Sequence, residues 1–141
     1  WRFNMNKMFI AIAFVAATTI AGCATTADDI VTEPLTKSEL EKVLIGNSYP
    51  LGSNIWENAK GGAYFSSATN ILVLWDGNKE QGTWRATDTS EFCISSPTFG
   101  TNDCTTLLRN ITEGGFVHRY NGENRDIAED QIVKGDIISD M

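Results

Sequence analysis

The chain has 141 residues, and its 18 Asp and Glu residues outnumber its 11 Lys and Arg residues, which gives a formal net charge of −7. This acidic balance argues against nucleic-acid partners, which select basic faces, and against charge-driven adhesion to anionic lipid headgroups. The length suits one domain with its own hydrophobic core.

The N-terminal part of the chain is typical of an export signal. Met5 to Lys7 provide a start and a positive charge, an uncharged apolar run covers residues 8–20, and small residues follow, as a signal peptidase requires. We therefore expect residues 1–22 to be a signal peptide, with residues 1–4 upstream of the true start. Two other interpretations are an uncleaved membrane helix, although the run is shorter than the ~20 residues that span a bilayer, and an ordinary signal cut near Ala24 or Ala27.

The segment Ile20-Ala21-Gly22-Cys23 closes this run and resembles the lipobox of bacterial lipoproteins. In that family the cysteine thiol is acylated and cleavage falls just before it, so the resemblance implies that acyl chains on Cys23 attach the protein to a membrane. Each buried methylene contributes about 0.8 kcal/mol, and two or more chains give stable attachment. Ala24 stands where an aspartate would retain such a lipoprotein at the inner membrane. The resemblance therefore implies the bacterial cell envelope, at the inner leaflet of the outer membrane facing the periplasm.

With Cys23 assigned to lipid, Cys93 and Cys104 form an even pair in an oxidising compartment, which predicts a disulfide. Closing that loop would add roughly 2–3 kcal/mol by chain entropy. A zinc site needs more ligands than two cysteines and one distant histidine supply, and a catalytic thiol needs a neighbouring base. The sequence contains no metal motif, phosphate loop or dinucleotide fingerprint, so we expect no cofactor.

The remaining chain divides into a tether and a domain. Residues 23–34 carry the lipidated cysteine and a small, polar, acidic stretch, which predicts a flexible tether, and residues 35–141 predict a single β-rich domain. Thr36 and Glu39 have the spacing of a capping box, and apolar residues at helical spacing follow up to Gly46. These signals predict a short helix over residues 37–45.

Beyond Gly46 the apolar pattern changes to a period of two, which is typical of strands. Strand-like segments cover residues 63–66, 71–75, 81–87, 91–95, 103–109, 115–120 and 132–133, with turn signals at Asp76-Gly77 and Asn121-Gly122. The predicted fold class is mostly β. It has a short N-terminal helix followed by an antiparallel, strongly curved sheet or small barrel of six to eight strands.

The domain from Leu35 onward resembles a group of proteobacterial envelope domains of unknown function. The matching pieces are Leu44-Ile45-Gly46-Asn47, Ala63-Tyr64-Phe65-Ser66, Gly82-Thr83-Trp84-Arg85, Phe92-Cys93-Ile94, Cys104-Thr105-Thr106-Leu107 and Lys134-Gly135-Asp136. This resemblance implies a fold and a location, and it implies no reaction.

Two shorter segments resemble other exported proteins. Gly82-Thr83-Trp84 is similar to the Gly-x-Trp strand of lipocalin-type barrels, although here it lies in the middle of the domain. Lys60-Gly61-Gly62-Ala63-Tyr64 is similar to the Ser-Gly-x-x-Tyr segment of lipoprotein inhibitors of c-type lysozyme, but it lacks the serine. The second resemblance makes inhibition of a c-type lysozyme or a protease the alternative function.

The chemistry-bearing residues favour binding over catalysis. His118 lies between Phe116 and Tyr120 in the alternating pattern and could act as an acid or base near neutral pH, but no nucleophile stands beside it in the sequence, which favours a structural histidine with one hydrogen bond. Asp76, Glu80, Glu91 and Asp103 could form a glycosidase pair, yet all sit beside turns, where acids are ordinary surface residues.

Aromatic residues are numerous, and most of them are expected in the core. One or two at a barrel mouth would form a binding surface, and the candidates for binding are Tyr64, Trp84, Phe116, His118 and Tyr120. We therefore expect a non-enzymatic binding or structural module, attached to the membrane by its acyl chains, with a protein, a glycan or a small apolar molecule as its partner.

Overall fold

The computed structural model describes residues 29–52, 56 and 61–141. The predicted signal peptide, Cys23 and most of the tether lie outside these residues. In the described part of the chain, no helix has the length and apolar character needed to cross a membrane.

The domain is built on a single antiparallel sheet. Its strand order is β10-β2-β3-β4-β5-β6-β7-β8-β9, and β1 pairs with the end of β7. The strands are β1 (Thr32–Pro34), β2 (Asn47–Pro50), β3 (Gly61–Phe65), β4 (Asn70–Trp75), β5 (Asn78–Ala86), β6 (Glu91–Ser96), β7 (Gly100–Asn110), β8 (Phe116–Tyr120), β9 (Glu123–Ile127) and β10 (Val133–Lys134).

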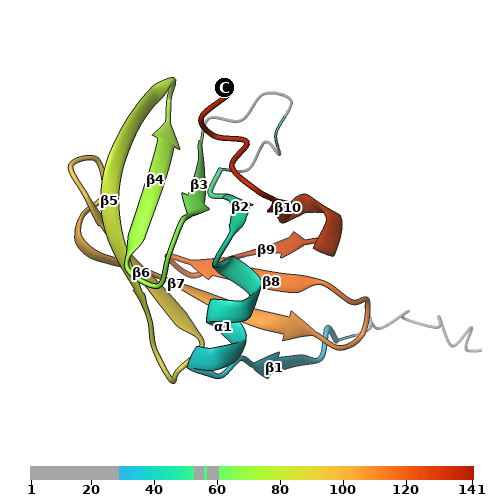
Figure 1. Cartoon of the computed structure of the whole chain (residues 1–141). Coiled ribbons are helices and arrows are strands. Elements are labelled where there is room, and N and C mark those ends of the chain that lie inside the picture. Colours follow the sequence, from blue (N-terminus) through green and yellow to red (C-terminus); the bar gives the residue numbers. More distant parts are fainter. Residues whose placement is uncertain (1–28, 53–55, 57–60) are drawn as a thin grey trace, which may run out of the picture.

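The sheet is strongly curled into a half-barrel (Figure 1). Its two terminal strands, β9 and β10, are joined by the short 3-10 helix η1 (Glu129–Gln131), so the chain passes from one edge of the sheet to the other within a few residues. The predicted class, mostly β with a strongly curved antiparallel sheet, is confirmed. The sheet has ten strands rather than six to eight, and the strands without a predicted counterpart are β1, β2 and β9. β1, which lies in the predicted tether, and β2 have only three and four residues, too few for a clear alternating pattern, and Ile127 is the one apolar residue of β9.

Helix α1 (Lys37–Leu44) closes one end of the half-barrel (Figure 1). The predicted capping box is present: the Thr36 hydroxyl accepts from the Glu39 amide at 3.3 Å, and the Glu39 carboxylate accepts from the Thr36 amide at 2.9 Å. Leu40 and Leu44, one turn apart, are fully buried against the sheet. The helix ends before Gly46, whose φ of +79° is a conformation that only glycine adopts without strain.

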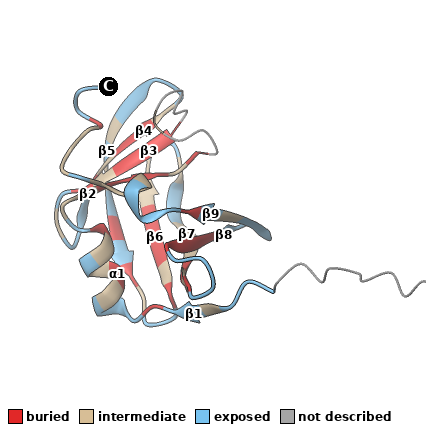
Figure 2. Cartoon of the chain, turned by 90° about the vertical axis from the view of Figure 1, so that its right-hand side faces the viewer, coloured by how far each residue is buried: buried red, intermediate tan, exposed pale blue. Residues whose placement is uncertain are grey.

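The strands alternate between an inner, concave face and an outer, convex face. The concave face carries the large apolar side chains at the α1 end, among them Phe65, Trp84 and Phe92, whose rings meet edge to face. Figure 2 shows the buried residues concentrated along the strands. Gly82 is needed on this face, because a Cβ atom there would lie 2.7 Å from the Ser95 carbonyl oxygen of the neighbouring strand. Gly82, Trp84 and Ala86 thus share one face, as the period of two over residues 81–87 predicts.

Cys93 of β6 and Cys104 of β7 are directly paired on these two neighbouring strands. Their sulfur atoms lie at disulfide distance, and their Cα atoms are 4.0 Å apart. The pair links the two strands of the hairpin whose turn carries residues 97–99.

Candidate ligand-binding pocket

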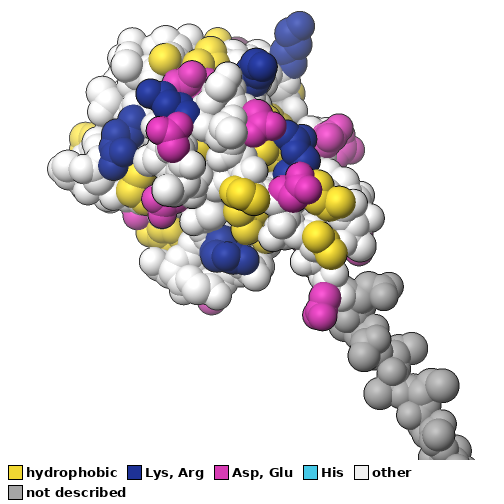
Figure 3. Space-filling model, turned by 90° about the horizontal axis from the view of Figure 1, so that it is seen from below, with side chains coloured by type: hydrophobic (Ala, Val, Ile, Leu, Met, Phe, Trp, Pro, Cys, Tyr) yellow, Lys and Arg dark blue, Asp and Glu magenta, His cyan; other side chains and the backbone are white. Residues whose placement is uncertain are grey.

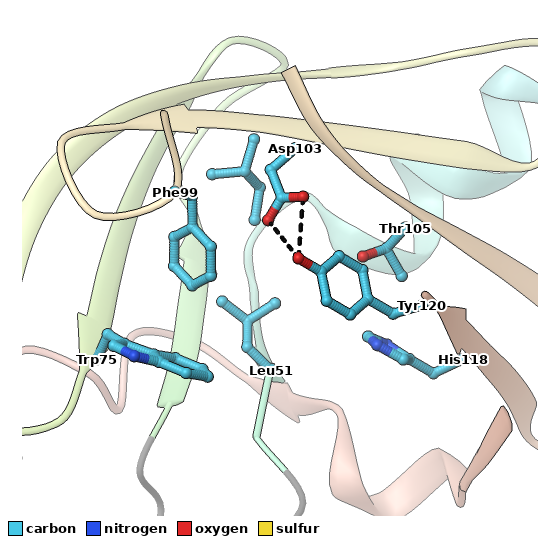
Figure 4. A pocket seen from close by; sticks show the side chains of 8 residues that line it. Leu51, Trp75, Phe99, Asp103, Thr105, His118 and Tyr120 are labelled. Carbon is cyan, nitrogen blue, oxygen red and sulfur yellow. Dashed lines mark hydrogen bonds between the residues drawn. The ribbon is translucent and has the colours of Figure 1, made fainter. Parts of the chain in front are cut away.

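The concave face carries a pocket at the end of the half-barrel away from α1. It has a volume of about 100 Å³, and we call it the aromatic pocket. Its position follows from the register: Trp75 ends β4, Tyr120 ends β8 and Asp103 lies near the start of β7, whereas the strand ends next to α1 carry the apolar core. The pocket is lined by Leu51, Trp75, Ile94, Phe99, Asp103, Thr105, His118 and Tyr120 (Figure 4).

Two of the aromatic walls come from different hairpins. The Trp75 and Phe99 rings meet edge to face, with centroids 5.2 Å apart and an interplanar angle of 74°. Figure 4 shows both rings on the side of the pocket opposite Tyr120 and His118, with Leu51 between them. Because an aromatic face carries a negative quadrupole, a pocket of this composition offers both apolar contact and a weak negative potential.

Glu80 holds the hairpin that carries Phe99. Its carboxylate accepts from the Ser96 hydroxyl at 2.5 Å, the Thr98 amide at 2.9 Å and the Thr98 hydroxyl at 3.0 Å. The hydrogen bond from Ser96 is the main cause of a lowered pKa for Glu80, so the carboxylate stays ionised and continues to accept. These bonds bring the tip of the β6–β7 hairpin over the edge of β5 and place Phe99 against Trp75.

A carboxylate and a phenol form the polar side of the pocket. The Tyr120 hydroxyl donates to Asp103, with distances of 3.1 and 3.2 Å to the two carboxylate oxygens (Figure 4). Burial, and then the charge of Asp103, raise the pKa of Tyr120, so its hydroxyl remains protonated at neutral pH. Asp103 is thus positioned by its neighbour while it remains at the surface of the pocket.

His118 forms part of the pocket wall and is joined to a buried tyrosine. Its Nδ1 lies 2.7 Å from the Tyr49 hydroxyl, and the two rings stack at 5.9 Å. Burial, and then the charge of Arg125, lower the pKa of His118 to about 4, so the imidazole is neutral at neutral pH. Burial also raises the pKa of the fully buried Tyr49.

Arg125 lies behind this pair at the edge of a second hollow. Its Nη2 donates to the Pro50 carbonyl at 2.8 Å, which ties β9 to β2 across the gap in the curled sheet, and its buried Nε has no hydrogen-bond partner among the described residues. The second hollow, of about 160 Å³, is lined by Glu123, Asn124 and Arg125 together with Leu51, His118 and Tyr120 of the aromatic pocket. The two hollows therefore adjoin.

The structure brings together two of the five binding residues predicted from the sequence. His118 and Tyr120 both line the aromatic pocket. Trp84 and Phe116 are buried in the core, where the Trp84 indole donates to the Ser67 carbonyl at 2.7 Å. Tyr64 lies on the convex face, because the alternate residues Ala63 and Phe65 point into the core.

Sequence reasoning did not assign Leu51, Phe99 or Arg125 to a site, and it treated Asp103 as an ordinary turn carboxylate. The period-two pattern places Asp103 and Thr105 on the same face as the core residue Leu107, which is the only local signal that this carboxylate points inward. Their proximity to Trp75 depends on the strand order and could not be read from the pattern.

The segment that resembles lysozyme inhibitors lies inside the sheet. Gly61 and Gly62 are buried in β3, which pairs with β2 on one side and β4 on the other. A Cβ atom on Gly61 would lie 2.3 Å from the Trp75 ring, so this glycine provides space for a pocket wall. No observation on the described residues favours insertion of this segment into an enzyme cleft.

Comparison of the chain with protein-family models, with curated proteins and with solved structures found no match. Among the described residues, no three His, Cys, Asp or Glu side chains gather into a group that could hold a metal ion. The function must therefore be inferred from the geometry of the aromatic pocket.

Proposed function

We propose that this protein is an envelope lipoprotein whose domain binds a small organic ligand in the aromatic pocket without transforming it. The observation that carries this proposal is the pocket itself, a concave and mostly apolar site with a few convergent polar groups, which is the usual composition of a small-molecule site. The lipid anchor rests on the lipobox-like segment ending at Cys23.

The position of the pocket supports a tethered binding module. β1, the first described strand, pairs with residues 108–110 at the end of β7, whereas Asp103 of the pocket lies near its beginning. The end seen in Figure 3 carries basic, acidic and apolar side chains interspersed, without a continuous patch of one kind on that face. A chain anchored through its N-terminus would therefore present the pocket away from the membrane.

The states of the polar groups support binding rather than catalysis. A general base works best with a pKa near the operating pH, and the pKa of His118, about 4, makes it a weak base at neutral pH. The His118 Nδ1 is already engaged by Tyr49, and Asp103 is engaged by Tyr120. Because their neighbours fix both side chains in one orientation, they form a preformed wall for a ligand.

A ligand screen tests the binding function. The protein is expressed from its full sequence and purified. It is then titrated with a panel of small apolar, aromatic, anionic and cationic compounds, and the backbone amide signals of Thr105, His118 and Tyr120 are followed by NMR. We expect at least one class to shift these signals and the Phe99→Ser variant to weaken that response. If no compound in the panel shifts any of the three signals, the proposed function is contradicted.

The anchor has its own test. Cys23→Ala should abolish acylation and release the protein from the membrane fraction, while Ala24→Asp should keep the acyl chains and move the protein to the inner membrane. A Cys23→Ala protein that is still cleaved at the same bond and still sediments with membranes would show that the lipoprotein assignment is incorrect.

A further inference from the structure

The aromatic pocket combines three aromatic side chains with one carboxylate. Trp75, Phe99 and Tyr120 come from β4, the β6–β7 hairpin and β8, and Asp103 from β7 projects between Phe99 and Tyr120 (Figure 4). None of these four side chains belongs to the buried core, and only Phe99 packs against it. Their convergence on one small hollow requires a separate explanation.

The charge of Asp103 has no cationic partner in the described part of the chain. The one ion pair there joins Arg109 to Glu39 at 3.5 Å, at the α1 end of the domain. Asp103 accepts hydrogen bonds from the neutral Tyr120 hydroxyl, which orients the carboxylate without cancelling its charge. A carboxylate held in an aromatic pocket in this way creates a site of negative potential.

We propose that the aromatic pocket binds the trialkylammonium group of a small organic cation of the choline type, an inference that rests on the binding function proposed above. Aromatic faces attract a cation through their quadrupole, and aromatic cages are the common means of recognising quaternary ammonium groups. The carboxylate of Asp103 adds the full charge that a cage of rings lacks. The net charge of −7 on the chain favours the approach of a cation.

The size of the pocket agrees with this class of ligand. An engineered cavity of roughly 150 Å³ binds benzene, so about 100 Å³ accommodates one compact headgroup rather than a larger ring system. The rest of the ligand would extend into the second hollow, past His118 and Tyr120. Glu123 and Arg125 both line that hollow, so it offers a carboxylate and a guanidinium to a neutral polar group such as the choline hydroxyl.

The neutral state of His118 is consistent with a cationic ligand. A protonated imidazole in the pocket wall would repel an ammonium group, and burial keeps His118 neutral at neutral pH. The other charged groups around it are Asp103 in the aromatic pocket and Glu123 and Arg125 in the second hollow.

The test compares choline with its neutral carbon isostere, in which a tert-butyl group replaces the trimethylammonium group. The two probes have nearly the same shape, so their difference reports the charge. Binding to the full-length protein is measured by calorimetry and by the NMR signals of His118 and Tyr120. We expect choline to bind about tenfold or more tightly than the isostere, since a desolvated cation–π contact and a carboxylate each favour the cation.

Substitutions assign this preference to the pocket. Asp103→Asn keeps the acceptor for Tyr120 and should weaken choline binding by about tenfold while leaving the isostere unaffected. Trp75→Leu should weaken choline more than the isostere. The matched controls are Glu113→Gln, which removes an exposed carboxylate outside the aromatic pocket, and Tyr64→Leu, which removes an aromatic ring from the convex face; neither should change choline binding.

Equal affinity for the two probes, or unchanged choline binding in Asp103→Asn, would overturn the cation assignment and leave the binding function standing. Absence of binding by both probes would also overturn the assignment, and the function would then depend on the wider ligand screen described above. The two proposals can therefore fail separately.

Discussion

The burial of His118 makes the stability of the domain depend on pH in a specific window. The ordinary pKa of histidine is 6.5, and burial lowers the pKa of His118 in the folded protein to about 4. Between these values the unfolded chain binds a proton that the folded protein does not bind. Unfolding is therefore favoured as the pH falls through this window, and the contribution of His118 is fully present above the unfolded pKa.

The magnitude follows from the two pKa values. The complete effect corresponds to about 3 kcal/mol, at roughly 1.4 kcal/mol for each pH unit, because the His118 side chain is only 7% exposed and solvent screening is small. Part of this loss of stability occurs on moderate acidification. We expect about 2 kcal/mol of stability to be lost between about pH 7.5 and about pH 5 through this residue alone.

The assay compares the wild-type protein with His118→Gln, which cannot be protonated and can still hydrogen-bond with Tyr49. The free energy of unfolding is measured by denaturant titration at both pH values. Glu39 and Glu80 have lowered pKa values, so their stabilising contributions are also lost as the pH falls through those values. Both residues are present in both proteins, so the difference between the two losses of stability reports His118 alone. Equal loss of stability in the two proteins would refute the argument.

Other predictions concern the covalent link, the sheet and the hairpin. Reduction of Cys93 and Cys104, which are 11 residues apart, should lower the free energy of unfolding by roughly 2–3 kcal/mol; an unchanged midpoint in reductant would argue against a bond between them. Gly82→Ala should destabilise the fold by about 1–3 kcal/mol, since its Cβ would meet a carbonyl oxygen of β6, whereas Thr83→Ala on the opposite face should cost less. Glu80→Ala should speed hydrogen exchange at the Thr98 amide, which donates to it at 2.9 Å; unchanged protection would show that the hairpin is held by other contacts.

Local signals were sufficient for much of the fold. The capping box of Thr36 and Glu39 predicted where α1 begins, because both partners lie within one turn of the chain. The alternation in β5 and β8 predicted which side chains share a face, since successive residues of a strand point to opposite sides. The turn signal at Asn121-Gly122 is confirmed by positive φ angles at both residues.

The sequence by itself thus determined the fold class, the extent of the helix and the two faces of the strands, because each depends on residues close together in the chain. The pocket was decided only by the tertiary structure. Trp75, Phe99, Asp103 and Tyr120 meet because the strand order and the curl of the sheet place the end of β4, the start of β7 and the end of β8 around one hollow. Phe116 and Tyr120 lie on the same face of β8, yet Phe116 is in the core and Tyr120 is in the pocket. The reason is that apolar side chains fill the α1 end of the half-barrel and leave a hollow at the other end.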